Sequence, residues 1–122
     1  MATNFSKKDM IKLQNLLRKS KKTITTAESC TGGLVASLIT KISGSSDIFN
    51  GSIVTYSNSI KNKELDVLNE SLDKFGAVSK QVVSEMLDGV LKKFEADFAI
   101  AISGIAGPNG GTKNKPVGTI VI

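Results

Sequence analysis

Short segments rich in β-branched residues alternate with longer helical segments along nearly the whole chain. The strand candidates are residues 23–27, 49–57, 97–103 and 117–122. The helix candidates are residues 6–20, 34–41, 58–66 and 79–94, whereas residues 67–78 show no regular pattern and are expected to be irregular. Strands that alternate with helices predict an α/β fold, in which the sheet is largely parallel and the helices cover its faces.

The helix candidates differ in their caps and in how much of their circumference is apolar. In the first, Ser6 is the expected N-cap and Asp9 completes a capping box. A single apolar stripe follows, formed by Met10, Leu13 and Leu17. The second helix has apolar residues at 34, 35, 38, 39 and 42, so we expect it to be buried on more than one side. Asn58 and Ser79 are the expected caps of the other two.

The length of 122 residues predicts a single domain, residues 1–122. No apolar run approaches the roughly 20 residues of a membrane-spanning helix, and residues 1–22 do not resemble a secretory signal. We therefore expect a cytoplasmic protein with no membrane partner. The apolar segment ending at Ile122 is typical of a buried strand, so we expect the domain to be truncated at its C-terminal end. Assembly into a homo-oligomer would be one way to complete such a sheet.

The chain contains no histidine and a single cysteine, Cys30. The missing histidine excludes Ser-His-Asp and Cys-His catalysis, as well as metals held by histidine. One cysteine allows no internal disulfide and no cysteine-cluster zinc site, and the carboxylates show no metal-like grouping. We therefore expect neither a metal nor a cofactor, and any catalyst in this chain must use Lys, Tyr, Ser, Asp or Glu.

The net charge of +5 raises the question of a nucleic-acid partner. Residues 1–22 hold seven basic side chains and one acidic side chain, whereas acidic groups slightly outnumber basic ones in the rest of the chain. The aromatic residues are scattered along the sequence and form no stacking platform. The excess charge is typical of a solvated lysine-rich helix face, so we do not expect nucleic acid as a partner.

The first candidate site residue is Ser29, which lies between a strand and a helix, where ligands gather in α/β folds. Its hydroxyl and the N–H groups that follow would face the same space, and the start of the helix would favour an oxyanion or a phosphate. Gly32 and Gly33 would let a ligand approach the backbone. The alternative is that Ser29 or Thr31 only caps the helix, with Cys30 a small, partly buried apolar residue.

The second candidate group, Tyr56 and Lys61, follows the next strand. A lysine whose pKa is lowered by burial or by a nearby cation can act as the base for a serine nucleophile, and the tyrosine hydroxyl could relay a proton. Glu28 is the only acid beside Ser29 and could orient Ser29 or Lys61. The alternatives are a surface lysine, a core tyrosine and a salt-bridged glutamate.

The third candidate is the glycine-rich loop at residues 103–113, which follows another strand. Such loops can hold phosphates through their backbone N–H groups. The loop matches neither the Walker pattern nor G-x-G-x-x-G, so neither an ATPase nor a dinucleotide-binding fold is indicated. An anion-binding loop and a flexible connection remain as alternatives.

Four segments, taken in order, resemble the CinA carboxy-terminal domain family, the competence-damage-inducible proteins. They are residues 26–34, residues 56–58 with Lys61, residues 76–79, and residues 104–108 with 115–119. The resemblance implies a three-layer α/β/α sandwich with a mixed, mostly parallel sheet. It also implies nicotinamide-nucleotide amidase activity on a small-molecule nucleotide, in which nicotinamide mononucleotide is hydrolysed to nicotinate mononucleotide and ammonia.

The resemblance also implies roles for individual residues. Carried over by position, Ser29 would be the nucleophile and Lys61 its base, with Tyr56 assisting. The backbone of the next four residues would stabilise the oxyanion: Cys30, Thr31, Gly32 and Gly33. We expect the glycine loop, together with Thr31, to hold the phosphate or the ribose through Gly104, Gly107 and Thr112.

One departure from the family concerns arginine. Family members carry an arginine that serves the site in a segment beyond the last strand here, whereas the only arginine of this chain is Arg18. A catalytically inactive nucleotide-binding module of the same fold is therefore the alternative function.

Overall fold

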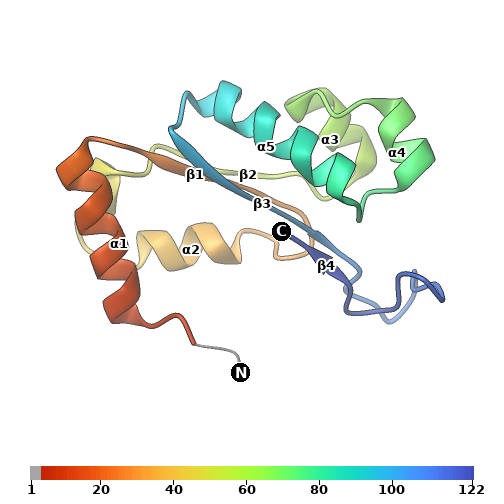
Figure 1. Ribbon diagram of the computed structural model, residues 1–122, viewed down its shortest axis with the longest axis horizontal. Helices are drawn as coiled ribbons and strands as arrows, with labels where there is room; N and C mark the ends of the chain where they lie inside the picture. Colours follow the sequence, from red (N-terminus) through yellow and green to blue (C-terminus); the bar gives the residue numbers. More distant parts are fainter. Residues whose placement is uncertain (1–3) are drawn as a thin grey trace.

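The computed structural model describes residues 4–122, which form one sheet with helices on both faces (Figure 1). The helices are α1 (Lys7–Ser20), α2 (Leu34–Thr40), α3 (Asn58–Leu65), α4 (Asn69–Phe75) and α5 (Lys80–Phe94), with a 3-10 turn η1 at Ser45–Asp47. The strands are β1 (Ile24–Glu28), β2 (Ile53–Val54), β3 (Phe98–Gly104) and β4 (Ile120–Val121). No helix in this part of the chain combines the length and apolar character needed to cross a membrane.

The strand order is β2-β1-β3-β4, with β1 parallel to both β2 and β3, and β4 antiparallel to β3. Glu28 at the end of β1 pairs in register with Val54 of β2 and with Ile102 of β3. The carboxyl ends of the parallel strands therefore meet at one edge, and Ser29 follows β1 at that edge. The prediction of an α/β fold with a mixed, mostly parallel sheet is confirmed.

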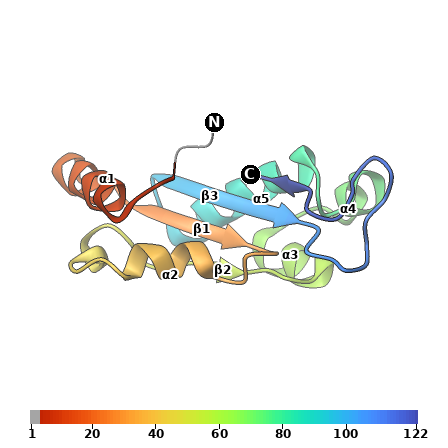
Figure 2. The same ribbon diagram turned by 90° about the horizontal axis from the view of Figure 1, so that it is seen from below.

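Two apolar clusters, one on each face of the sheet, make the fold three-layered (Figures 1 and 2). Successive side chains of β1 point to opposite faces, so Ala27 packs on one side and Ile24 on the other. The cluster under α3, α4 and α5 consists of Ala27, Leu65, Val67, Leu72, Val82, Val83, Met86, Val90 and Ala101. The cluster under α1 and α2 is smaller and consists of Leu17, Ile24, Ile39 and Ile48.

Helix α1 begins as its sequence predicts, with Ser6 as N-cap and a complete Ser6–Asp9 capping box. Side-chain hydrogen bonds then connect α1 to α2 and to η1. The buried Gln14 side chain donates to the Ile39 carbonyl of α2 at 3.0 Å. Arg18 donates to Asp47 at 2.9 Å and to the Gly44 carbonyl at 3.0 Å. The single arginine of the chain therefore joins α1 to η1.

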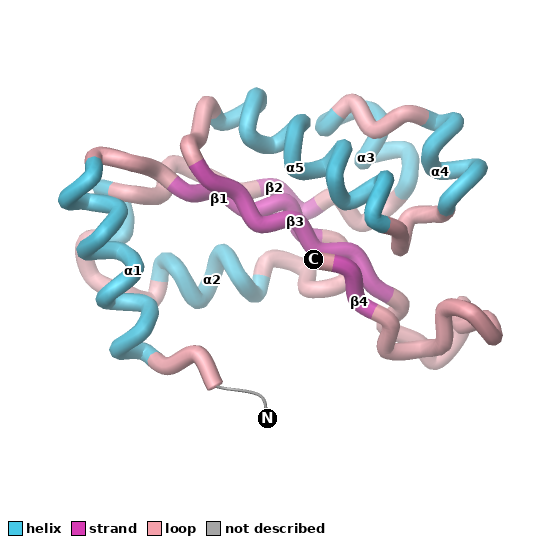
Figure 3. The backbone as a smooth tube through the Cα atoms, in the orientation of Figure 1, coloured by secondary structure: helices cyan, strands magenta, loops and turns pink. Residues whose placement is uncertain are grey.

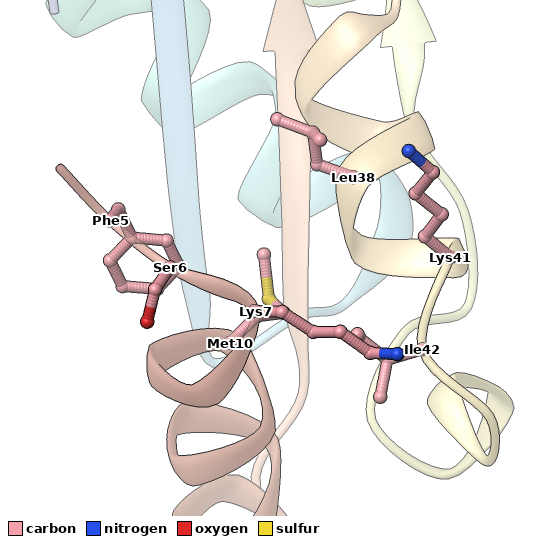
Figure 4. A pocket seen from close by; sticks show the side chains of 7 residues that line it. All are labelled: Phe5, Ser6, Lys7, Met10, Leu38, Lys41 and Ile42. Carbon is pink, nitrogen blue, oxygen red and sulfur yellow. The ribbon is translucent and has the colours of Figure 1, made fainter.

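Helix α2 is much less buried than its apolar sequence predicts. Ile39 is its only buried residue, while Leu34 and Leu38 are 58% and 45% exposed. The prediction of burial on more than one side is wrong, because the small cluster under α1 and α2 meets only one side of this helix. An open groove of about 470 Å³ lies between the start of α1 and the end of α2 (Figure 4).

The strand expected at residues 49–57 is reduced to Ile53–Val54. Before β2, side-chain hydroxyls of β1 and of Ser52 bind backbone carbonyls that a longer strand ladder would pair with N–H groups. The Thr25 hydroxyl donates to the Gly51 carbonyl at 2.7 Å, and the Ser52 hydroxyl donates to the Thr26 carbonyl at 2.6 Å.

Helix α4 lies where the sequence predicts irregular chain. Its N-cap, Leu68, has no side chain that can cap a helix, but its N–H donates at 2.8 Å to the Glu85 carboxylate of α5. This contact joins residues 17 positions apart, so local sequence does not show what holds the start of α4. In α3, the cap is Ser57 rather than the expected Asn58, and its hydroxyl accepts from the Ile60 N–H at 3.2 Å.

Helices α5 and α3 lie on the same face of the sheet (Figure 3), and α3 carries Lys61. Gly89 of α5 lies against Leu65 at the end of α3. A Cβ atom at this position would overlap the Leu65 carbonyl oxygen and would lie 2.9 Å from Leu65 Cα. Because those atoms belong to the α3 backbone, no side-chain movement could make room. A side chain at position 89 would therefore push apart α5 and the end of α3, the helix that carries Lys61.

We predict that Gly89→Ala destabilises the fold. Overpacking at this crossing should lower the free energy of unfolding by about 1–3 kcal/mol. Helix propensity alone would raise it by about 1 kcal/mol, so the two effects have opposite signs. Denaturant unfolding measures the difference, with Ser84→Ala on the exposed side of α5 as the control. A stabilised Gly89→Ala protein would contradict the close approach.

Candidate active site

Ser29 and Lys61 meet at the carboxyl edge of the sheet, although 32 residues separate them in sequence. Ser29 follows β1 directly, and its N–H donates to the Ile102 carbonyl at 2.9 Å, which extends the pairing with β3 by one residue. The Lys61 Nζ atom lies 3.1 Å from the Ser29 Oγ atom. Both side chains are buried, so the structure brings together the serine and the lysine that the sequence singled out.

Lys61 is only 1% exposed, which is unusual for a lysine. Its amine donates to the Thr55 carbonyl at 2.8 Å and to the Tyr56 carbonyl at 3.1 Å, in addition to its contact with Ser29. Within residues 4–122, no carboxylate forms an ion pair with it. Burial lowers the pKa of the Lys61 amine, and the nearby Cys30 sulfur partly offsets that effect.

The three partners of the Lys61 amine determine what its neutral form can do. The carbonyl oxygens of Thr55 and Tyr56 can only accept hydrogen bonds. A neutral amine has two N–H groups, which these carbonyls would occupy, and one lone pair, which then faces the Ser29 hydroxyl. The arrangement can therefore take a proton from Ser29, as a general base must.

Glu28 precedes Ser29 but contacts neither Ser29 nor Lys61 by a hydrogen bond in the described part of the chain. One carboxylate oxygen accepts from the Thr31 hydroxyl at 2.7 Å and from the Val35 N–H at 2.9 Å. The other oxygen accepts from the Ala36 N–H and the Thr26 hydroxyl, both at 2.9 Å. Burial raises the pKa of Glu28, but these four hydrogen bonds together outweigh it and lower the pKa below its ordinary value. Glu28 therefore reaches Ser29 only through the strand, loop and helix that it binds, and no ion pair within residues 4–122 includes it, so the alternative of a salt-bridged glutamate is wrong.

The same contacts change the expectation for the start of α2. The N–H groups of Val35 and Ala36 are taken by Glu28, and that of Leu34 by the Thr31 carbonyl. The helix end is therefore not open to an oxyanion or a phosphate, contrary to the sequence prediction.

The loop before α2 does keep unpaired donors. The Gly32 N–H donates to the Ser29 carbonyl at 3.0 Å. The N–H groups of Cys30, Thr31 and Gly33 donate to no acceptor among the described residues. These free N–H groups lie within four residues of the Ser29 hydroxyl. They are the groups in this loop that could bind an oxyanion.

Tyr56 enters the site through its main chain rather than its side chain. Its carbonyl accepts from Lys61, but the side chain is 68% exposed and its hydroxyl forms no hydrogen bond within residues 4–122. The role of the hydroxyl as a proton relay stays a prediction that no observed contact supports.

The glycine loop reaches the site only at its start. A Cβ atom on Gly104 would lie 2.8 Å from the Cys30 Sγ atom, so β3 and the Ser29 loop touch there. Thr112 forms a turn with Lys115, whose amine donates to the Phe75 carbonyl of α4 at 2.7 Å. Neither Gly107 nor Thr112 forms a hydrogen bond with Ser29 or Lys61 in the described structure, so their role in substrate binding stays a prediction.

Sequence reasoning missed Thr55, Thr26 and Ser52. Thr55 is fully buried, and its carbonyl holds the Lys61 amine, while its own hydroxyl has no hydrogen-bond partner in the described part of the chain. A backbone carbonyl leaves no signal in sequence, because every residue has one. Thr26 and Ser52 form a hydroxyl pair behind Glu28, and the β-branched strand pattern concealed this polar role.

Two other features of the described residues lie away from this site. No group of three or more Cys, Asp or Glu side chains is arranged to hold a metal ion within residues 4–122. The groove between α1 and α2 is lined by Phe5, Ser6, Lys7, Met10, Leu38, Lys41 and Ile42, none of which is a candidate site residue (Figure 4).

Comparison with known sequences gives consistent results. Residues 7–122 match the family described as the CinA C-terminal domain. A CinA-like protein of Prochlorococcus marinus strain MIT 9312 is 61% identical over 106 residues, which are 87% of this chain and 25% of that protein. A CinA-like protein of Thermotoga neapolitana is 54% identical over 107 residues, or 88% and 26% respectively. The chain therefore spans about a quarter of the length of the curated relatives it matches.

Solved structures resemble the fold closely. The competence/damage inducible protein CihA from Agrobacterium tumefaciens has a TM-score of 0.88 at 43% identity, covering 91% of this chain and 67% of that one. A competence-damaged protein (CinA) superfamily protein from Escherichia coli has a TM-score of 0.90 at 35% identity, covering 98% and 70%.

We predict that Gly104→Ala displaces Cys30 and disturbs the Ser29 loop. The added methyl group would also lie 3.0 Å from the Thr119 carbonyl oxygen, so the loss of stability should be about 1–3 kcal/mol. In a Cys30→Ala background, where the sulfur is absent, the same substitution should cost less. A double-mutant cycle of unfolding free energies measures the coupling. An equal loss in both backgrounds would contradict the contact between the two residues.

Proposed function

The chain belongs to the CinA C-terminal domain family, and we propose that it hydrolyses nicotinamide mononucleotide to nicotinate mononucleotide and ammonia. The observation that carries the proposal is the buried Lys61 amine 3.1 Å from the Ser29 hydroxyl, with carbonyl oxygens as the amine's other hydrogen-bond partners within residues 4–122. A chain without histidine needs another base for a serine nucleophile, and a neutral lysine supplies one.

In the first half of the proposed reaction, the neutral Lys61 amine removes the proton of the Ser29 hydroxyl as the Oγ atom bonds to the carboxamide carbon. The carbonyl oxygen of the substrate becomes an oxyanion, which the free N–H groups of the Ser29 loop can bind. The Lys61 ammonium then gives its proton to the leaving nitrogen. The C–N bond breaks, ammonia departs, and an ester joins the nicotinoyl group to Ser29.

In the second half, water attacks the ester and gives a proton to Lys61. The bond between Ser29 Oγ and the acyl carbon breaks, and the proton returns to the serine oxygen. The products are nicotinate mononucleotide and the starting enzyme. One lysine serves both halves because its amine faces the same oxygen in each.

The reaction makes a direct prediction for Ser29 and Lys61. Ser29→Ala removes the nucleophile and Lys61→Met removes the base, so each should lower ammonia release from nicotinamide mononucleotide by about 1,000-fold or more. Lys63→Met is the matched control, because Lys63 lies exposed on the same helix. It should change the rate by no more than about twofold.

Isothermal titration with the same nucleotide separates the alternatives. Binding without ammonia release by the unmodified chain would favour the inactive nucleotide-binding module over the amidase. Equal ammonia release by the unmodified chain and Ser29→Ala would contradict Ser29 as the nucleophile.

The lowered pKa of Lys61 predicts a pH dependence. Only the neutral amine can act as base, so kcat/KM should rise with pH through the Lys61 pKa, which lies below its ordinary value of 10.5. The unfolded chain holds this proton more tightly, so folding stability should also rise with pH between the folded-state pKa and 10.5. The Lys61→Met variant should lose that stability slope. A rate that does not increase with pH below 10.5 would contradict a neutral lysine base.

A further inference from the structure

Glu28 is a buried carboxylate that the proposed reaction does not use, although it precedes the nucleophile. It is 0% exposed, and its four hydrogen bonds come from three parts of the chain: Thr26 of β1, Thr31 of the loop, and Val35 and Ala36 of α2. One side chain therefore ties together the strand before Ser29, the loop after it and the helix that follows. We propose that Glu28 is the positioning residue that holds the nucleophile loop, residues 29–33, in its reactive conformation.

A direct part in acid–base chemistry does not fit the contacts of Glu28. An ionised carboxylate has about four lone-pair sites, and four donors occupy them here. None is left for Ser29 or Lys61. The lowered pKa keeps the carboxylate ionised at neutral pH, so it has no proton to give. Glu28 acts on the reaction only through the shape of the loop.

The nucleophile loop needs such a support because α2 does not supply one. The N-cap of α2 is Gly33, which has a φ of 103° and no side chain to cap the helix. Packing gives little help, since Ile39 is the only buried residue of α2. The carboxylate of Glu28 replaces the missing cap at Val35 and Ala36, and it fixes the middle of the loop through Thr31.

The conformation that Glu28 holds has two features that matter for acyl transfer. Ser29 Oγ lies within hydrogen-bond distance of the Lys61 amine, and the N–H groups of Cys30, Thr31 and Gly33 carry no acceptor among the described residues. Behind the carboxylate, the Thr26 hydroxyl that donates to it also contacts the Ser52 hydroxyl. The support therefore extends from the loop to the segment before β2.

The proposal rests on the proposed role of Ser29, so its test uses a reaction that does not depend on the natural substrate. The probe is p-nitrophenyl acetate, whose acetyl group would move to Ser29 Oγ while nitrophenolate leaves and Lys61 takes the serine proton. Nitrophenolate release gives the rate, and mass spectrometry of the Ser29 peptide identifies the adduct. The Ser29→Ala protein supplies the background from other nucleophiles.

The test variant is Glu28→Gln, which keeps the side-chain shape but places an NH₂ group where two donors point. A small displacement of a reacting group can cost about 100-fold in rate, so Ser29 acetylation should fall by about 100-fold. With nicotinamide mononucleotide, kcat should fall while KM stays within about twofold. The matched control is Glu85→Gln, because the Glu85 carboxylate also accepts a backbone N–H at the start of a helix, that of Leu68 before α4, but lies away from the site. It should keep the acetylation rate within about twofold.

Each outcome decides the proposal. Slow acetylation in Glu28→Gln but not in Glu85→Gln, at a temperature where both are folded, supports positioning. Equal rates in the two variants overturn it, as does an unmodified chain whose Ser29 is not acetylated. If the unmodified chain acetylates Ser29 but releases no ammonia from nicotinamide mononucleotide, the amidase proposal fails, and the acetylation rates of the two variants still decide the positioning role.

A second variant covers the case in which Glu28→Gln does not fold. Thr31→Val keeps the shape of the side chain and removes one of the four donors. Losing one hydrogen bond to a charged group should reduce the acetylation rate by about tenfold. An unchanged rate in this variant overturns the proposal.

Discussion

The buried amine of Lys61 needs three hydrogen-bond partners, and the arrangement of the site follows from where it finds them. Two are main-chain carbonyls at the end of the β2 segment, and the third is the Ser29 hydroxyl at the end of β1. These groups meet only because β1 and β2 are parallel and end at the same edge of the sheet. Helix α3 brings the lysine to that edge, and α5 packs closely against the end of α3 at Gly89. The position of the Lys61 amine beside Ser29 thus depends both on the strand order and on the packing of α3.

A second buried charge, on Glu28, is satisfied in a different way. Two of the three partners of the Lys61 amine are carbonyl oxygens, which only accept, so its neutral form would keep a lone pair for the proton of the third partner, the Ser29 hydroxyl. Glu28 is surrounded by donors, which keep its carboxylate ionised. The two side chains do not pair with each other, so each keeps its own protonation state. The lysine can therefore change charge during a reaction while the glutamate beneath the loop holds the backbone still.

Sequence pattern was sufficient where an element carries its own signals. Helix α1 has its capping box and α5 has its serine cap and apolar stripe, so both were predicted near their observed bounds. Helix α4 was missed because it has no capping side chain of its own, and the carboxylate that binds the Leu68 N–H at its start belongs to α5. The strand at β2 was predicted too long because Thr25 and Ser52 take up hydrogen bonds of the neighbouring backbone. Helix α2 was predicted to be buried because its residues are apolar, but burial depends on what packs against them.

The sequence by itself determined the layered α/β fold, the exclusion of histidine chemistry, and Ser29 and Lys61 as candidate residues. These follow from local periodicity, composition and position at strand ends, all of which are properties of neighbouring residues. Only the tertiary structure decided that the serine and the lysine touch, that carbonyls rather than a carboxylate hold the amine, and that Glu28 supports the loop instead of the base. The physical reason is that backbone groups carry no sequence signal, and that burial, which lowers the pKa of Lys61, exists only after distant segments have packed together.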